Sequence, residues 1–501
     1  MSPSATRQAG IHRTKSVEQS VRETDEPETR LRKDLGTWDL IVFGVAVVIG
    51  AGIFTLAAST AGDIAGPSVS LAFVLAAIAC GLAALCYAEF ASTVPVAGSA
   101  YTFSYATFGE FVAWIIGWDL VLEFAVGSAV VAKGWSAYLG EVLGLAGAQV
   151  DTSVPLGFFS FDWGALLLVA VLTTLLYLGT KLSSRVNLVI TTIKVAIVLF
   201  VVVLGLFYVN AANYEPFIPP AAEGGDSATG LGQSLLSLLG GGASSTYGVY
   251  GLLAAASLVF FAFIGFDVVA TTAEETRNPQ RSVPRGIIGS LVIVTVLYVA
   301  VALVLTGMVP YTELATVGED RATLATAFAA RGVDWAAAII SIGALAGLTT
   351  VVMVLLLGQT RVLFAMSRDG LLPYGLSRTG KYGTPERATL LVGGAVAVAA
   401  TFFPAGALEE MVNIGTLFAF VLVSIGVMVL RRSRPDLPRA FRTPLVPVVP
   451  VLAVLACAWL MLNLTVETWL RFVIWMAIGL VVYFAYGRRH SRLAQELHAG
   501  R

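Results

Sequence analysis

Long apolar runs divide this sequence, and each of the twelve is long enough to cross a lipid bilayer. A helix needs about 20 residues to span a hydrocarbon core of about 30 Å. Charged residues make up 13% of the chain, well below the roughly 25% of a soluble domain. The runs are 38–62, 67–90, 106–139, 163–181, 185–209, 247–272, 285–309, 334–366, 387–404, 409–430, 445–464 and 466–487. We therefore expect an all-α polytopic membrane protein with twelve transmembrane helices. The length of the third and eighth runs favours tilted or extended helices over two crossings each.

Lysine and arginine, which accumulate in cytoplasmic loops, indicate the orientation. One set of loops is rich in arginine, for example at Arg368 and Arg431, and both basic tails lie on that side because the number of spans is even. We expect both termini in the cytoplasm and the protein in the cell inner (plasma) membrane. The expected segments are a disordered cytoplasmic tail without a signal peptide (1–36), helices 1–5 (37–209), an extracellular loop (210–246), helices 6–10 (247–430), a cytoplasmic loop with helices 11 and 12 (431–487) and a cytoplasmic tail (488–501).

Glycines interrupt the first and sixth runs at their middles, at Gly50 and Gly52 and at Gly265. A helix can unwind inside a bilayer only where it is buried in protein or lines a water-filled cavity. Matching breaks in two halves of a chain point to the midplane site of a secondary transporter. The freed N–H groups suit a carboxylate and the freed carbonyls suit an ammonium, so one pocket could bind an α-amino acid. Close helix packing is the alternative, and Asp267, just after the second break, favours the binding site.

The sequence lacks the histidine and cysteine patterns that a metal site, a disulfide framework or most membrane enzymes would need. All three histidines lie in the tails, and the cysteines lie inside apolar runs without a Cys-x-x-Cys pair, at Cys80, Cys86 and Cys457. We expect no metal, no cofactor, no disulfide framework and no enzyme activity.

Six short motifs occur in the order of a known family. They occupy residues 50–54, 87–101, 117–123, 263–267 with Glu274 and Glu275, 365–373 and 441–444. From about residue 35 to 486 the sequence resembles the amino acid–polyamine–organocation transporters, and within them the bacterial relatives of the cationic amino acid transporters.

The resemblance implies a fold and a set of site residues. The fold has two inverted repeats of five helices and two peripheral helices. Amides of the first span bind the substrate carboxylate, carbonyls of the sixth span bind its amine, and the ring of Phe266 serves as a gate. The resemblance implies Ala51, Gly52 and Ile53 for the amides and Phe261, Ala262 and Ile264 for the carbonyls. We also expect Ile49 and Gly50, at the first break, among the substrate-binding residues.

Lys194 lies nine residues into the fifth span, about 14 Å along the helix. A lysine at this depth is a functional candidate by default. The alternative is a structural ammonium hydrogen-bonded to carbonyls of a broken helix. In similar proton-coupled members a fifth-span lysine stands where sodium-coupled relatives bind sodium, which implies a role in proton coupling for Lys194, with Gly50 and Thr349 or Thr350 as neighbours.

Carboxyl groups also lie within the runs. Glu123 and Asp119, one turn apart in the third run, share a helix face. Glu123 matches a family glutamate close to the substrate, and a structural pair is the alternative. Charged residues at the cytoplasmic span ends, such as Glu89, are either solvated caps or a gate of salt bridges.

The function expected is proton-coupled uptake of L-amino acids by alternating access. An exchanger of two amino acids, or of an amino acid and a polyamine, would look nearly the same. Glu123 leaves cationic substrates possible, whereas Val352 and Met353 suit small neutral ones. The expected partners are the amino acid, the proton and the lipid bilayer, with no nucleic acid, and we expect a monomer.

Overall fold

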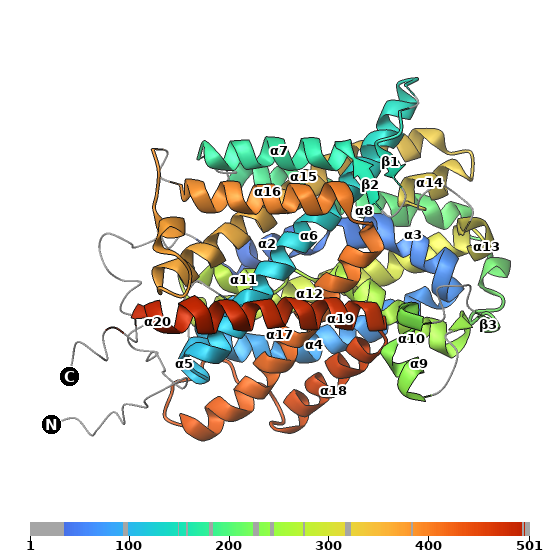
Figure 1. The fold of residues 1–501 in the computed structure, drawn as a ribbon. Coiled ribbons are helices and arrows are strands. Elements are labelled where there is room, and N and C mark those ends of the chain that lie inside the picture. The colour runs from blue at the N-terminus through green and yellow to red at the C-terminus, as the bar shows by residue number, and fades with distance from the viewer. Residues whose placement is uncertain are drawn as a thin grey trace.

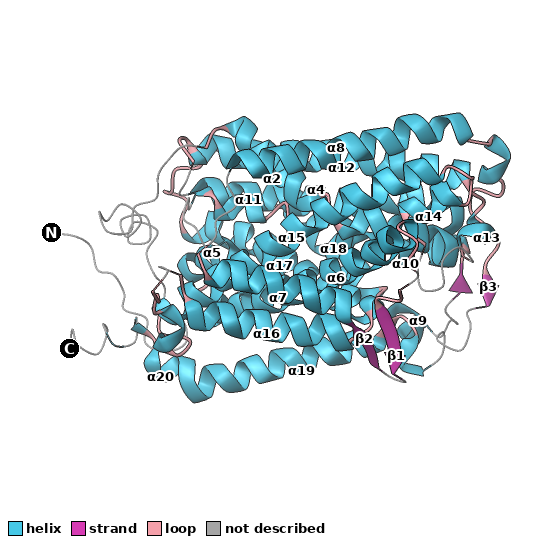
Figure 2. Ribbon diagram, turned by 90° about the horizontal axis from the view of Figure 1, so that it is seen from above, coloured by secondary structure: helices cyan, strands magenta, loops and turns pink. Residues whose placement is uncertain are grey.

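The computed structural model describes residues 35–93, 99–148, 150–156, 159–179, 184–223, 230–240, 245–273, 276–315, 322–381, 384–492 and 495. These residues form a bundle of long helices that run along a common direction, with short strands at one end only (Figures 1 and 2). Residues 1–34 of the predicted N-terminal tail lie outside the described residues.

Each predicted apolar run contains helical structure. The helices are α2 (Thr37–Val48), α4 (Val69–Thr93), α6 (Glu110–Leu145), α7 (Trp163–Tyr177), α8 (Ser184–Gly205), α10 (Gly248–Val259), α12 (Pro279–Met308), α15 (Asp334–Arg368), α16 (Glu386–Phe402), α17 (Ala405–Ser433), α18 (Val448–Leu462) and α19 (Val466–Val482). Among the described residues, eight helical stretches are long and apolar enough to cross a membrane, and α2, α7 and α18 are shorter apolar helices. The third and eighth runs are single helices, as predicted. Twelve crossings and an inverted repeat stay predictions.

Short elements lie at the two ends of the bundle. They are α5 (Ser99–Thr107), α9 (Leu235–Gly240), α13 (Tyr311–Leu314), α14 (Leu324–Ala329), α20 (Arg488–His490) and the strands β1 (Ser153–Leu156), β2 (Phe159–Asp162), β3 (Ala222–Glu223) and β4 (Ser245–Thr246). β1 pairs with β2 and β3 with β4, both antiparallel. α5 and α20 lie at one end of the bundle, and the strands lie at the other (Figure 1).

The first predicted break is present. α2 ends at Val48 because Ile49 leaves the helical conformation. The chain then resumes as a π-helical turn (Gly52–Leu56) and continues into α3 (Ala57–Thr60) and a second π-helical turn (Ala61–Ala65). The first span is therefore two half-helices joined by a short extended segment.

The second predicted break is also present. α10 tightens into a 3-10 turn (Phe260–Phe263), and Ile264 is extended. Gly265 follows with φ at +111°, a conformation that favours glycine. The short helix α11 (Val268–Thr271) comes after it. Gly265 can adopt this positive φ, which would be strained for a residue with a side chain.

α6 is the central helix of the bundle. It packs against α15 and α17, and also against α7, α16 and α19. Burial on several sides explains why its apolar residues show no single preferred face. Its polar residues Asp119 and Glu123 are consequently buried as well, with 0% and 2% of their surface exposed.

Candidate functional site

A cavity lies where the two broken spans meet α6, α15 and α17. It is lined by Val47, Val48, Gly50, Ala51, Gly52, Glu123, Gly127, Val131, Phe261, Ile264, Val351, Leu355 and Val412. The wall combines glycine main chain from the first break with aliphatic side chains and the single carboxyl group of Glu123. A cavity of this make-up offers main-chain polar groups on one side and an apolar surface on the other.

Six of the ten predicted substrate-binding residues line this cavity: Gly50, Ala51, Gly52, Glu123, Phe261 and Ile264. The other four are buried next to the breaks rather than in the lining: Ile49, Ile53, Ala262 and Phe266. The ring of Phe266 packs on Phe420, with 5.1 Å between ring centroids, and on Tyr87. Its role as a gate stays a prediction.

The two broken spans touch main chain to main chain. A Cβ atom at Gly52 would lie 2.3 Å from the Cα atom of Ala262, and one at Gly265 would lie 2.7 Å from Val47 Cγ1. Carbon atoms in contact are normally about 3.5–4.0 Å apart. Gly52 and Gly265 are therefore needed for close packing, and the same packing places Gly50 and Gly52 at the cavity. The packing interpretation of these glycines is thus confirmed, and substrate binding at the breaks stays a prediction.

Lys194 of α8 reaches the end of α2. Its Nζ donates hydrogen bonds to the carbonyls of Ala46 at 2.8 Å and Ile49 at 3.3 Å, and the side chain is 1% exposed. The hydroxyl of Tyr298 donates to Val48 O at 2.7 Å. Carbonyls that the break releases thus find donors from the protein, as a buried backbone requires.

Lys194 has one neighbour that was not among the expected ones. Gly347 of α15 lies against its methylene stem, because a Cβ at Gly347 would be 2.9 Å from Lys194 Cγ. The hydroxyls of Thr349 and Thr350 donate to carbonyls of their own helix, and their place beside Lys194 stays a prediction.

Three buried carboxyl groups lie at or near the cavity: Glu123, Asp119 and Asp267. Among the described residues, no protein donor reaches either oxygen of Asp119, Oε1 of Glu123 or Oδ1 of Asp267. A buried polar atom without a partner is unfavourable, and an unpaired buried charge is more so. Of the three carboxyl groups, Glu123 lines the cavity, so its Oε1 can accept a hydrogen bond from a ligand there, whereas Asp119 and Asp267 lie outside the lining.

The lining residues that were not predicted from the sequence are Val47 and Val48 of α2, Gly127 and Val131 of α6, Val351 and Leu355 of α15, and Val412 of α17. Gly127 and Val131 follow Glu123 at intervals of four residues, so a helical repeat from Glu123 would have found them. Val352 and Met353, named from the sequence, are buried outside the lining.

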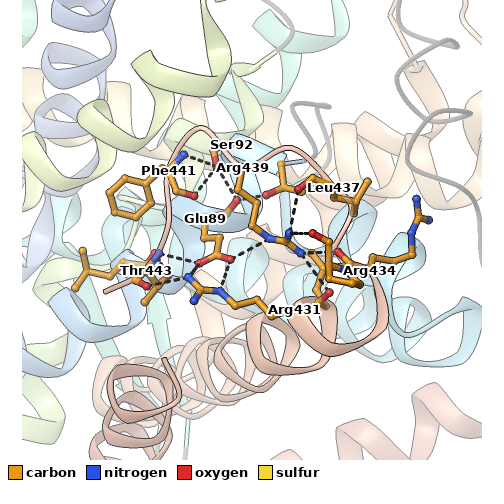
Figure 3. Close-up of polar contacts among 12 residues, drawn as sticks. Glu89, Ser92, Arg431, Arg434, Leu437, Arg439, Phe441 and Thr443 are labelled. Atoms are coloured by element: carbon orange, nitrogen blue, oxygen red, sulfur yellow. Dashed lines mark hydrogen bonds and ion pairs between the residues drawn. The ribbon is translucent and has the colours of Figure 1, made fainter. Parts of the chain in front are cut away.

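A second polar cluster lies at the end of the bundle that carries α5 and joins α4, α17 and the segment after α17 (Figure 3). The Glu89 carboxylate accepts hydrogen bonds from Arg431 Nε at 2.9 Å, Arg431 Nη2 at 2.7 Å and Thr443 N at 2.8 Å. Arg439 Nε lies 3.4 Å from Glu89 Oε1. Glu89 is 1% exposed and so is not a solvated cap. Glu274 and Glu275 lie outside the described residues.

The chain matches the amino acid permease family over residues 35–484. It is 44% identical over 493 residues to the branched-chain amino acid permease of Bacillus subtilis, covering 97% of this chain and 99% of that protein. It is 42% identical over 469 residues to the methylthioribose transporter of the same bacterium, covering 92% and 95%. A vacuolar cationic amino acid transporter of Arabidopsis thaliana is 39% identical over 412 residues, which cover 81% of this chain and 61% of the relative.

These matches confirm the resemblance drawn from the six motifs. The family and these relatives are transporters rather than enzymes, which agrees with the prediction that the chain has no enzyme activity. Together with the long apolar helices they establish a multi-pass membrane protein. This chain belongs to the amino acid permease family of the amino acid–polyamine–organocation superfamily.

Proposed function

We propose that this protein takes up L-amino acids by alternating access and that protons drive the uptake. The observation that carries the proposal is the cavity between two broken helices, lined by main chain at Gly50 to Gly52 and by Phe261 and Ile264. Membership of the amino acid permease family gives the substrate class.

The head group of the substrate would bind at the two breaks. Amides of Ala51, Gly52 and Ile53 begin the second half of the first span, where the half-helix dipole favours a carboxylate. Carbonyls of the sixth span, around Ala262, would accept hydrogen bonds from the α-ammonium group. This arrangement uses main chain for the part that all amino acids share and leaves the walls of the cavity for the side chain.

Lys194 is the residue proposed for proton coupling. Its ammonium group supplies to the carbonyls of Ala46 and Ile49 the positive charge that a bound sodium ion could supply. Transport would then need no sodium. Loss of the proton would weaken the link between α8 and the first span, so the protonation state would bias the bundle between conformations.

The substrates proposed are neutral aliphatic amino acids. Val131, Val351, Leu355 and Val412 form an apolar wall, against one carboxyl group at Glu123. The names of the relatives cover branched-chain and cationic amino acids and methylthioribose, so all three classes belong in a test. We also propose twelve crossings with two inverted repeats of five helices, cytoplasmic termini in the plasma membrane, and a monomer.

Uptake into proteoliposomes tests the proposal. Purified protein is reconstituted with empty vesicles and with vesicles preloaded with unlabelled leucine, and the entry of labelled leucine is followed with lysine, methylthioribose and alanine as competitors. A proton-coupled carrier fills empty vesicles when the outside is acidic. Uptake that occurs only into preloaded vesicles would identify an exchanger instead, and the absence of leucine entry into both sets of vesicles would refute the proposed substrates.

A further inference from the structure

One face of α6 forms a continuous side of the cavity. Glu123, Gly127 and Val131 recur every four residues and therefore lie on the same face of the helix. Leu355 and Val351, four residues apart on α15, line the cavity from the neighbouring helix. α6 and α15 pack along each other, so these two rows of side chains define the space between them.

Gly127 differs from the glycines at the breaks. A Cβ atom built there would have one neighbour within 4 Å, Leu355 Cδ1 at 3.7 Å, which is an ordinary contact. At Gly52 the same atom would lie 2.3 Å from the main chain of Ala262. Gly127 is therefore not needed for close helix packing. Glycine is also a poor helix former, so local stability gives no reason for it in the middle of α6.

We propose that Gly127 sets the largest substrate side chain that the cavity accepts. The missing side chain leaves room between α6 and Leu355, and the substrate side chain would occupy this room when its head group is bound at the two breaks. Gly127 and Leu355 would thus act together as a specificity determinant. The inference rests on the proposed function, because it requires the cavity to bind amino acids.

The effect of filling this space follows from the number of carbon atoms added. Gly127→Ala adds one carbon and Gly127→Val adds three. One methylene group in an apolar pocket changes discrimination by about 10- to 200-fold, so Gly127→Val should weaken leucine and isoleucine at least ~10-fold and change alanine by no more than about threefold. Gly127→Ala should weaken binding by a smaller factor, and again more for leucine and isoleucine than for alanine.

Leu355→Ala provides a second, opposite change. If the two residues bound the same space, Leu355→Ala combined with Gly127→Val should restore much of the affinity for leucine, because residues in contact show non-additive effects. Gly134→Ala is the matched control on the same helix. Its Cβ would meet Ala51 and Thr55 at 3.4 Å, and Gly134 does not line the cavity, so any loss there should be equal for small and large substrates.

The measurement is the dissociation constant of detergent-purified wild type and variants for alanine, valine, leucine and phenylalanine, by calorimetry. Size-dependent losses in Gly127→Val, with recovery in the double variant, support the assignment. Equal losses for alanine and leucine, or unchanged leucine binding, overturn it while the proposed function stands. A wild-type protein that binds none of the four would overturn the proposed function and this assignment with it.

Discussion

Gly52→Ala tests whether the two broken spans must touch at the site. The added Cβ would lie 2.3 Å from Ala262 Cα, 2.5 Å from its Cβ and 2.9 Å from its N. Carbon contacts at about 3.5–4.0 Å require the spans to separate by at least about 1 Å. Overpacking of this kind destabilises a packed region by about 1–3 kcal/mol. If all of this free energy destabilises the substrate-bound conformation, the dissociation constant for the substrate rises by about 5- to 150-fold.

Calorimetric titration of the purified variant with leucine, together with its melting temperature, gives both quantities. Gly81→Ala in α4 is the control, because a Cβ there would have no neighbour within 4 Å. It should bind leucine as the wild type does. Wild-type affinity and melting temperature in Gly52→Ala would show that the spans do not need this contact.

The remaining predictions concern three charged residues. Lys194→Met removes both hydrogen bonds to the first span. The dissociation constant for leucine should stay within a few-fold of the wild-type value, but accumulation driven by a proton gradient should be lost. A variant that still concentrates leucine would exclude Lys194 from coupling. Glu123→Gln should weaken the binding of lysine more than that of alanine, by about 1–3 kcal/mol of binding free energy as measured by competition. Equal changes for the two amino acids would make Glu123 structural. Glu89→Gln leaves Arg431 and Arg439 without their anion. Breaking a buried ion pair costs about 3–5 kcal/mol of stability, and less here because the Arg431 side chain is 27% exposed. The melting temperature of Glu89→Gln should therefore fall clearly below that of Asp436→Asn, which breaks an exposed pair. Equal melting temperatures for those two variants would contradict a stabilising role.

The helices and the two breaks could be predicted from sequence because the bilayer imposes strict conditions on the backbone. An apolar run of sufficient length must be helical, and an interruption must be buried or hydrated. Ile49 and Gly265 leave the helical conformation within the segments where the glycines indicated it. The depth of Lys194 similarly pointed to a buried ammonium group, and the structure supplies carbonyl partners for it.

The walls of the cavity could not be predicted in the same way. α6 and α15 are apolar around most of their circumference, so the pattern does not tell which face meets the cavity. Val351 and Leu355 line it, whereas the adjacent Val352 and Met353 do not. The burial of Glu89 depends on the segment around Thr443, more than 300 residues away in sequence, which covers it. Long-range docking of this kind leaves no local signal.

Accumulation of labelled leucine in sodium-free proteoliposomes tests the central claim most directly. The vesicles start without internal substrate, and the outside is made acidic relative to the inside. Proton coupling predicts that leucine rises above its outside concentration and that a protonophore, which collapses the gradient, abolishes the rise. Equal concentrations on both sides under the pH gradient, or accumulation only after sodium is added, would contradict proton-coupled uptake.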